Sequence, residues 1–295
     1  MAVIDAFLAF GGLQTGPGEK SGNALYKRLI RGLSRSGSAA ASNFGLGRAM
    51  MSQVWDAMEF TVRPVEVNEI LPWRELYRQE MNCQIVHDSL HPREGWTQPY
   101  LIELDGETAG YGSIVVGGPW AGTRTMFEFY VLEKQRSRFF EAFDALRSAS
   151  EANAIETQTN DVMLTAMLHT WAHDIYSEKI VFEDKLTTAY RVPGAVLRKQ
   201  EPEGSGMLLE VGGEVVATGG ILYHYNRPYG DIWMEVSETF RRRGYGTYLV
   251  QELKRICREG GSIPCARCNT ENAASRKTLQ KAGFVPCAHI LHGKL

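Results

Sequence analysis

Apolar and polar positions follow the same pattern in two stretches of the chain that lie 107 residues apart. Each stretch has two short apolar segments joined by a tight turn: residues 101–114 turn at Asp105-Gly106, and residues 208–221 turn at Gly212-Gly213. Six of the 14 aligned positions are identical. Such dipeptides between apolar segments predict β-hairpins.

The same elements follow each hairpin in the same order. Residues 127–131 form an apolar strand pattern that leads into a helical pattern over 138–149, and residues 232–236 lead into a helical pattern over 244–258. A chance similarity between two hairpins would not extend to the elements behind them. A period of about 106 residues therefore predicts a duplicated domain rather than a solenoid.

The remaining elements differ between the two copies. In the first copy the pattern predicts strands at 60–65, 155–157 and 180–182, and helices at 68–90 and 161–172. The second copy starts its hairpin from about residue 201, and then adds a strand at 263–268, a helix at 273–282 and a last strand after Phe284. Strands and helices alternate, which predicts an α/β fold with mixed twisted sheets flanked by helices.

Composition narrows the class of protein. The 295 residues have ordinary globular proportions, which exclude collagen-like, coiled-coil and wholly disordered chains. No apolar run approaches the roughly 20 residues of a membrane span, so we expect no membrane partner. The net charge of -2 argues against nucleic acid as a partner. Five cysteines, an odd number, favour cytoplasmic thiols over a disulfide framework.

The near-neutral total hides an uneven distribution of charge. Residues 1–57 carry six basic and three acidic side chains and are rich in Gly, Ser and Ala, so we expect a flexible basic extension. An organellar transit peptide is one alternative, and a true start at Met50, Met51 or Met58 is another. The rest of the chain, with a net charge of -5, divides into copies at 58–195 and 196–295. An acidic body would attract a cationic partner.

Candidate chemistry is concentrated in residues 234–247. A strand ends at Val236, a basic glycine-containing turn follows, and an amphipathic helix begins near Gly244. A helix N-terminus offers unpaired N–H groups and the positive end of the helix dipole. Gly244 and Gly246 would let a phosphate approach these groups, and Arg241–Arg243 add charge. The pattern predicts a site for a pyrophosphate.

The spacing Arg-x-x-Gly-x-Gly, five residues after the strand-ending Val236, resembles motif A of the GCN5-related N-acetyltransferase (GNAT) family. A second stretch is similar to the Asn-bearing helix of that family: Asn272-Ala273-Ala274-Ser275, followed by the run from Leu279 to Gly283-Phe284. The two motifs occur in the family's order and cover about residues 205–290. The resemblance implies a tandem GNAT fold.

The resemblance also implies acetyl-CoA as co-substrate, with no metal. The amides of the basic turn would hold the pyrophosphate, the main chain at 234–236 would pair with the pantetheine arm, and the Val236 amide would polarise the thioester carbonyl. Asn272 would contact the CoA arm. The residues so assigned are Met234, Val236, Arg241, Arg242, Arg243, Gly244, Tyr245, Gly246, Thr247 and Asn272.

Direct attack on the thioester needs a neutral amine and therefore a base. Glu235 is the first candidate because it lies beside the strand that would separate from its neighbour, and Asp231 is the second. A solvent-facing Glu235 without a role in catalysis is an equal alternative. The usual Tyr of the family, seven residues after the helix Asn, is replaced by Leu279, so the general acid is unassigned. Tyr245 or Tyr248 would be substitutes.

The first copy departs further from the family pattern. Arg136 aligns with Arg241, but Phe139 and Glu141 stand where the second copy has Gly244 and Gly246. The side chain of Phe139 would block the approach of a phosphate to the backbone, and the charge of Glu141 would repel it. We therefore expect a degenerate half that does not bind CoA.

Other cysteine, histidine and aromatic residues can be explained by structural roles. Cys265 and Cys268, three apart on one strand, would point to opposite faces, so structural thiols are favoured over zinc. His87, His91 and Glu94 are expected to be surface residues. The aromatic residues that would line an acceptor site, or equally pack in a core, are Trp96, Trp120, Tyr223 and Tyr225.

The sequence therefore predicts an N-acetyltransferase that acts on an amine of a small molecule or of a protein. A non-catalytic acyl-CoA-binding or regulatory module is the alternative, because the usual Tyr is missing. A structural scaffold is a third reading and would not bind CoA. A homodimer is left open.

Overall fold

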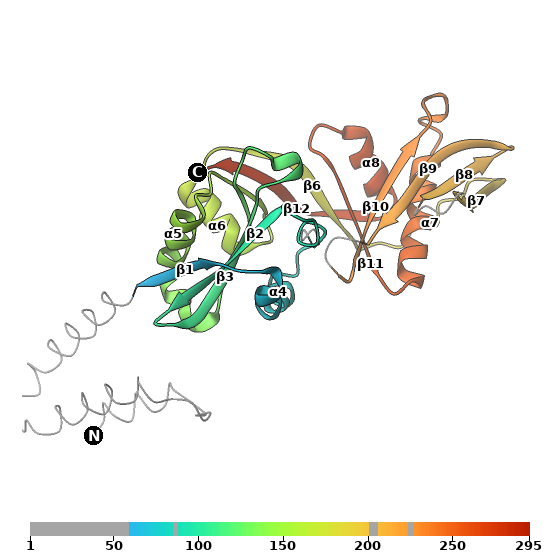
Figure 1. Ribbon diagram of the computed structural model, residues 1–295. Helices are drawn as coiled ribbons and strands as arrows, with labels where there is room; N and C mark the ends of the chain where they lie inside the picture. Colours follow the sequence, from blue (N-terminus) through green and yellow to red (C-terminus); the bar gives the residue numbers. More distant parts are fainter. Residues whose placement is uncertain (1–58, 85–87, 201–205, 224–226) are drawn as a thin grey trace, which may run out of the picture. The chain divides into compact units, whose positions relative to one another are not determined.

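The computed structural model describes residues 59–84, 88–200, 206–223 and 227–295 (Figure 1). They belong to one compact unit, Glu59–Leu295. The expected basic extension at 1–57 lies outside the described residues. Within the described part of the chain, no helix is long and apolar enough to span a membrane.

The elements of the first half follow the predicted order. Its strands are β1 (Phe60–Pro64), β2 (Thr97–Leu104), β3 (Glu107–Val115), β4 (Thr125–Val131), β5 (Ala154–Gln158) and β6 (His173–Asp184). Its helices are α4 (Val67–Met81), α5 (Phe139–Ser150) and α6 (Val162–Trp171), and the 3₁₀ turns are η1 (Gly118–Trp120) and η2 (Glu133–Arg138).

The second half repeats this order without a helix between its first two strands in the described residues. Its strands are β7 (Ala195–Lys199), β8 (Gly206–Val211), β9 (Glu214–Leu222), β10 (Tyr229–Val236), β11 (Ile263–Asn269) and β12 (Phe284–Lys294). Its helices are α7 (Tyr245–Glu259) and α8 (Ala273–Lys281), with the 3₁₀ turn η3 (Glu238–Phe240). The predicted α/β fold class is confirmed.

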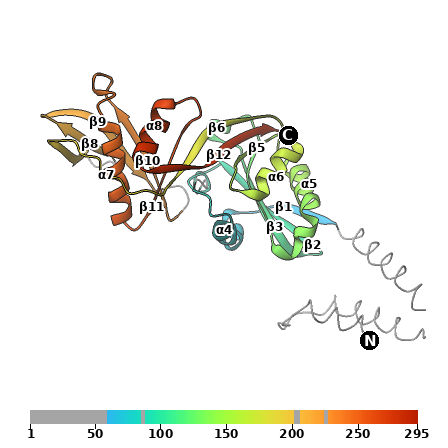
Figure 2. The ribbon, with the colours of Figure 1, turned by 180° about the vertical axis from the view of Figure 1, so that it is seen from behind.

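The two halves share one continuous sheet in which they exchange their last strands. The strand order is β1-β2-β3-β4-β5-β12-β6-β11-β10-β9-β8-β7. Thus β12, from the end of the chain, pairs with β5 of the first half, and β6 pairs with β11 of the second half. The exchanged strands pair with each other in antiparallel fashion at the centre (Figures 1 and 2).

An ion pair and main-chain contacts fasten the exchanged strand β6 to the second half. Lys254 on α7 is fully buried and meets Asp184, the last residue of β6, at 2.8 Å. Its Nζ also donates to the carbonyl oxygens of Leu186 at 2.8 Å and of Ala282 at 2.5 Å. Burial lowers the pKa of Lys254, and Asp184 opposes that shift. The ammonium group therefore has three partners inside the fold.

The two faces of the second half carry different clusters. On one face, α7 packs against β9, β10 and β11, and the main apolar core there includes Phe182, Leu249 and Leu253. A smaller cluster lies on the sheet where β10, β11, β6 and β12 meet, around Val181 and Cys265. Because side chains alternate along a strand, adjacent Val181 and Phe182 of β6 contribute to opposite faces.

Two local expectations are corrected. The helix predicted over 68–90 ends at Met81, because Asn82 takes a left-handed conformation with φ 50° and its N–H bonds back to Arg78. The pattern also missed β7, a short strand of alternating exposure at the edge of the sheet beside β8. A five-residue edge strand has too few apolar positions to stand out in a sequence.

Candidate functional site

The strands β10 and β11 separate partway along their length. They are parallel neighbours from Tyr229–Ile263 to Ile232–Ala266, which is the last pair in their register. On its other side, β10 remains paired with β9 up to Val236. The main chain at 233–236 therefore presents its β11-facing edge without a strand partner among the described residues, as the predicted pairing with an extended ligand requires.

The basic turn connects this open edge to α7. Gly244 precedes the helix with φ 87°, a conformation that favours glycine, and supplies no capping side chain. The first turn of α7 contains no acidic residue. The N–H groups of a first turn have no acceptor within their own helix, so this end of α7 attracts an anion.

The second glycine of the motif has a different structural reason from the one expected. A Cβ built on buried Gly246 would lie 3.1 Å from Val236 Cγ2, 3.3 Å from Thr278 Cγ2 and 3.5 Å from Met234 Sδ. Gly246 thus lets α7 lie close to β10, and so brings the first turn near the open edge. Thr247 beside it is buried.

The three arginines of the turn are exposed. Arg241 Nε donates to the carbonyl oxygen of Val236 at 3.4 Å, which holds its side chain against the end of β10. Arg242 has a left-handed φ of 64°. The guanidinium of Arg243 lies 5.5 Å from the ring centre of Phe240. The turn is therefore compact, and its positive charge faces water.

Asp231 and Glu235 lie on the same strand in different surroundings. Asp231 is 4% exposed and lies one residue before the end of the β10–β11 pairing. Burial raises its pKa to about 6, partly offset by Arg267, whose Nε donates to Asp231 Oδ2 at 3.1 Å. Its other oxygen, Oδ1, is buried without a hydrogen-bond partner. Glu235 is exposed.

The other predicted residues of this half either pack in the core or cap a helix. Asn272 precedes α8, and its Oδ1 accepts from the N–H of Ser275 at 2.9 Å. Leu279, at the place of the family's Tyr, is buried in the core. Tyr245 and Tyr248 are partly buried against the same core. Burial raises the pKa of Tyr248.

The corresponding turn of the first half is closed by its own side chains. Arg136 meets Glu80 on α4 at 2.5 Å and lies over the ring of Tyr130. Phe139, in the place of Gly244, packs 5.3 Å from the ring of Phe129. The strand β4 is buried along its whole length, unlike the half-exposed end of β10.

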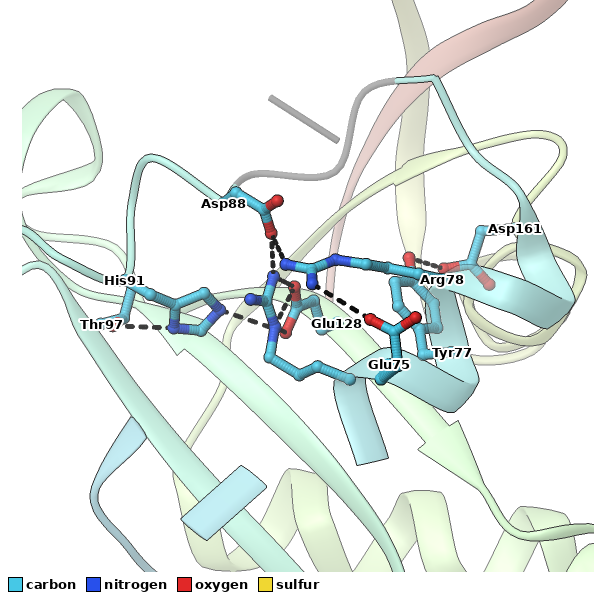
Figure 3. A network of polar contacts seen from close by, with 9 residues as sticks. Glu75, Tyr77, Arg78, Asp88, His91, Thr97, Glu128 and Asp161 are labelled. Carbon is cyan, nitrogen blue, oxygen red and sulfur yellow. Dashed lines mark hydrogen bonds and ion pairs between the residues drawn. The ribbon is translucent and has the colours of Figure 1, made fainter. Parts of the chain in front are cut away.

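A buried network of charges occupies the first half between α4 and β4 (Figure 3). Arg74 and Glu128 form a bidentate pair, with Nη2–Oε1 at 2.5 Å and Nε–Oε2 at 3.0 Å. His91 Nε2 lies 3.2 Å from Glu128 Oε2. Burial alone would raise the pKa of Glu128, but Arg74 and His91 outweigh it and hold that pKa well below its usual range.

Asp88 extends this network to the partly exposed side of α4. Asp88 accepts from Arg74 at 2.9 Å and also pairs with Arg78. Separately, Tyr77 donates to Asp161 Oδ2 at 2.8 Å (Figure 3). The expectation that His91 is a surface residue is wrong: His91 is buried, and its ring lies against Glu128 of β4, 37 residues further along the chain.

The remaining candidates are placed as follows. Cys265 and Cys268 are free thiols in different clusters on opposite faces of the sheet. Among the described residues, no group of His, Cys, Asp and Glu could hold a metal ion. Trp96 and Trp120 pack on a cluster of the first half, and Tyr223 is half exposed. His87 and Tyr225 lie outside the described residues.

Comparisons with known proteins agree with this geometry. Residues 166–284 match the model of the acetyltransferase (GNAT) family. That range begins in α6 and ends at the start of β12, so it includes the exchanged strand β6. A search of curated proteins found no match.

Solved structures show the same fold. A GNAT-family acetyltransferase from Colwellia psychrerythraea superposes with a TM-score of 0.62 at 13% identity, over 80% of this chain and 99% of its own. A GCN5-related N-acetyltransferase from Sphaerobacter thermophilus gives 0.53 at 13%, over 79% and 94%. A tandem GNAT protein from the clavulanic acid biosynthesis pathway gives 0.50 at 12%, over 81% and 98%. At these identities the likeness concerns the fold.

Proposed function

We propose that this chain, which carries a GNAT-family domain over residues 166–284, transfers an acetyl group from acetyl-CoA to an amine at the second half of its sheet. The observation that supports this most directly is the combination of an open β10 edge with an uncapped, glycine-led N-terminus of α7 at its end. One element suits an extended amide-bearing arm, and the other suits a pyrophosphate.

The residues at this site fit the coenzyme. Gly244 adds no side chain of its own at the start of α7, Gly246 lets that helix lie close to β10, and exposed Arg241–Arg243 add positive charge in the preceding turn. The main chain of Met234–Val236 would bind the pantetheine arm, and the Val236 amide would polarise the thioester carbonyl. Bound acetyl-CoA would supply the activated acetyl group: the amine nitrogen would attack the thioester carbonyl and give up a proton to the base, the C–S bond would break, and CoA would leave as a thiolate that takes a proton from water.

We infer that Asp231 rather than Glu235 is the base, the reverse of the order inferred from the sequence, and the burial of Asp231 supports this. A carboxylate with a pKa near 6 accepts a proton more readily near neutral pH than an ordinary carboxylate does. Asp231 lies two residues, about 7 Å, below the open segment that begins at Trp233. Its Oδ1 has no hydrogen-bond partner and is the oxygen that would take up the proton. Exposed Glu235 would attract the cationic acceptor.

Burial of Leu279 at the place of the family's Tyr supports one alternative, a CoA-binding module that does not turn over. Calorimetric titration with acetyl-CoA, followed by measurement of thiol release with a panel of amines, separates the two functions. Binding with thiol release is the expected result. Binding without release from any amine would favour the module, and the absence of binding would refute both.

A further inference from the structure

The segment that joins the two halves, between β6 and β7, runs along α7 towards the basic turn at residues 241–244. After β6 ends at Asp184, Lys254 of α7 holds the carbonyl oxygen of Leu186 at 2.8 Å. Thr188 Oγ1 then donates to Gln251 Oε1, also on α7, at 2.8 Å. The connecting residues are thus fastened to α7 at two successive points as they approach its N-terminus.

A single glutamine fixes the main chain at Tyr190. The N–H of Tyr190 donates to Gln251 Oε1 at 2.7 Å, and Gln251 Nε2 donates to the carbonyl oxygen of Tyr190 at 3.0 Å. This double contact sets the position and the direction of the Tyr190 backbone. Gln251 lies seven residues after Gly244, two helical turns along the same face of α7.

The side chain of Tyr190 reaches the turn itself. A Cβ built on Gly244 would lie 2.6 Å from Tyr190 Oη and 2.8 Å from Cε1, so the phenol end of the ring rests on this glycine. The ring is 44% exposed. A hydroxyl donor therefore lies next to Gly244, immediately before the first turn of α7.

We propose that Tyr190 is a coenzyme-binding residue whose hydroxyl donates a hydrogen bond to a phosphate group held at the first turn of α7. This inference rests on the proposed function. Gln251 is the positioning residue that holds Tyr190 in place. The connection that follows the exchanged strand β6 thus completes the phosphate site of the second half. A tyrosine hydroxyl suits this role because it donates to an anion without carrying charge of its own.

The test compares Tyr190→Phe with the wild type in calorimetric titrations with acetyl-CoA. This variant removes the hydroxyl and keeps the ring that packs on Gly244. We expect the Kd for acetyl-CoA to rise about tenfold, the loss typical of one hydrogen bond to a charged group, with an unchanged midpoint of thermal unfolding. Gln251→Ala should raise the Kd less. Tyr176→Phe is the matched control, because exposed Tyr176 stacks on His292 instead.

The possible results separate this inference from the proposed function. If the wild type does not bind acetyl-CoA, the proposed function itself fails. If the wild type binds and Tyr190→Phe binds equally well, only the role of Tyr190 is refuted. A weakened Tyr190→Phe whose unfolding midpoint falls as well would also contradict the inference, since the hydroxyl would then support the fold. An equal loss in Tyr176→Phe would contradict it too.

Discussion

Arg136 and Arg241 occupy equivalent places in the two halves, and the Nε of each donates to the carbonyl oxygen of the valine five residues before it, at 3.0 Å and 3.4 Å. Their surroundings differ. Arg136 is neutralised by Glu80 of α4, whereas Arg241 is exposed and lies 3.6 Å from the exposed Glu238. The same turn therefore has its charge satisfied internally in the first half and directed to water in the second.

The first testable consequence concerns Gly244. In Gly244→Ala the new Cβ would lie 2.6 Å from Tyr190 Oη, and an alanine at φ 87° is strained. We expect acetyl-CoA binding, measured by calorimetry, to weaken by about tenfold or more, the loss of one charge-assisted contact. Gly244→Trp should abolish binding.

The turn after α7 provides a control for backbone strain. Gly261 has φ 78°, and a Cβ there would meet nothing within 4 Å. Gly261→Ala should therefore lower the free energy of unfolding by about 1 kcal/mol, as a left-handed alanine does, and leave acetyl-CoA binding unchanged. Equal losses of binding in both variants would refute the placement of the coenzyme at Gly244.

The second prediction is the pH dependence of acetyl transfer. Because the pKa of Asp231 is raised to about 6, its basic form appears as the pH rises through that value, and kcat/KM should rise with it. Asp231→Asn should remove this limb and lower kcat/KM by about 10²-fold or more. Glu235→Gln should keep the limb and mainly raise KM for a cationic acceptor. A limb that persists in Asp231→Asn would exclude Asp231 as the base.

The raised pKa of Asp231 affects stability in the opposite direction to activity, through the linkage of proton binding to folding. Its pKa is higher in the folded chain than the ordinary value of 3.8, so the folded state binds the proton more tightly. The contribution of Asp231 to stability is therefore fully present below that ordinary value and is lost as the pH rises through about 6. Asp161 has a raised pKa of about 6 for the same reason, burial. Activity, rather than unfolding, is thus the measurement that isolates Asp231.

Local signals explain why much of the fold could be predicted. The hairpin turns at Asp105-Gly106 and Gly212-Gly213 are encoded by two residues each, and φ is positive at all four. An apolar stripe preceded by a basic turn predicts the helix after Gly244. The structure places the residues of that motif around one helix end, whereas the coenzyme itself stays a proposal.

The exchange of β6 and β12 could not be predicted, because the sequence of each strand is compatible with more than one pairing partner. Each is the last strand of its copy and each has a short apolar stretch, so either could have paired within its own copy, β6 with β5 or β12 with β11. The pairing is decided by contacts distant in sequence, such as Lys254 with Asp184. Likewise, the sequence around His91 does not indicate that it contacts Glu128, and the sequence around Tyr190 does not indicate that it contacts Gly244.

The third prediction concerns the buried pair of Arg74 and Glu128. Glu128→Gln leaves the guanidinium buried, and Arg74→Met leaves the carboxylate buried, so each should lower the free energy of unfolding by about 3–5 kcal/mol. Replacing both, as Arg74→Met with Glu128→Gln, should cost less than the sum of the two single variants, because neither charge of the pair remains. Urea unfolding measures these values.

The same pair should set part of the response to acid. Because Arg74 and His91 hold the pKa of Glu128 below its usual range, its contribution is present above about pH 4.3 and is lost as the pH falls further. Folded Glu128→Gln protein should still bind acetyl-CoA like the wild type. A specific loss of binding in that variant would show that the network takes part in the second half's chemistry.

The last prediction follows from the strand exchange. Residues 173–295 contain the unbroken run β12-β6-β11-β10-β9-β8-β7, whereas residues 195–295 lack β6, which lies between β11 and β12. Loss of β6 removes Val181 and Phe182, buried on opposite faces and worth about 2 kcal/mol each, and leaves two strand edges unpaired. That loss is a large part of a typical domain's stability.

We therefore expect the fragment 173–295 to fold and to bind acetyl-CoA, and the fragment 195–295 to remain unfolded or to aggregate. Circular dichroism and calorimetry on both fragments check this. Since Tyr190 and Lys254 are present in the longer fragment, its coenzyme site should be intact, while its newly exposed β12 edge should lower its solubility. A well-folded fragment 195–295 that binds acetyl-CoA as tightly would show that the second half does not need the strand it receives from the first.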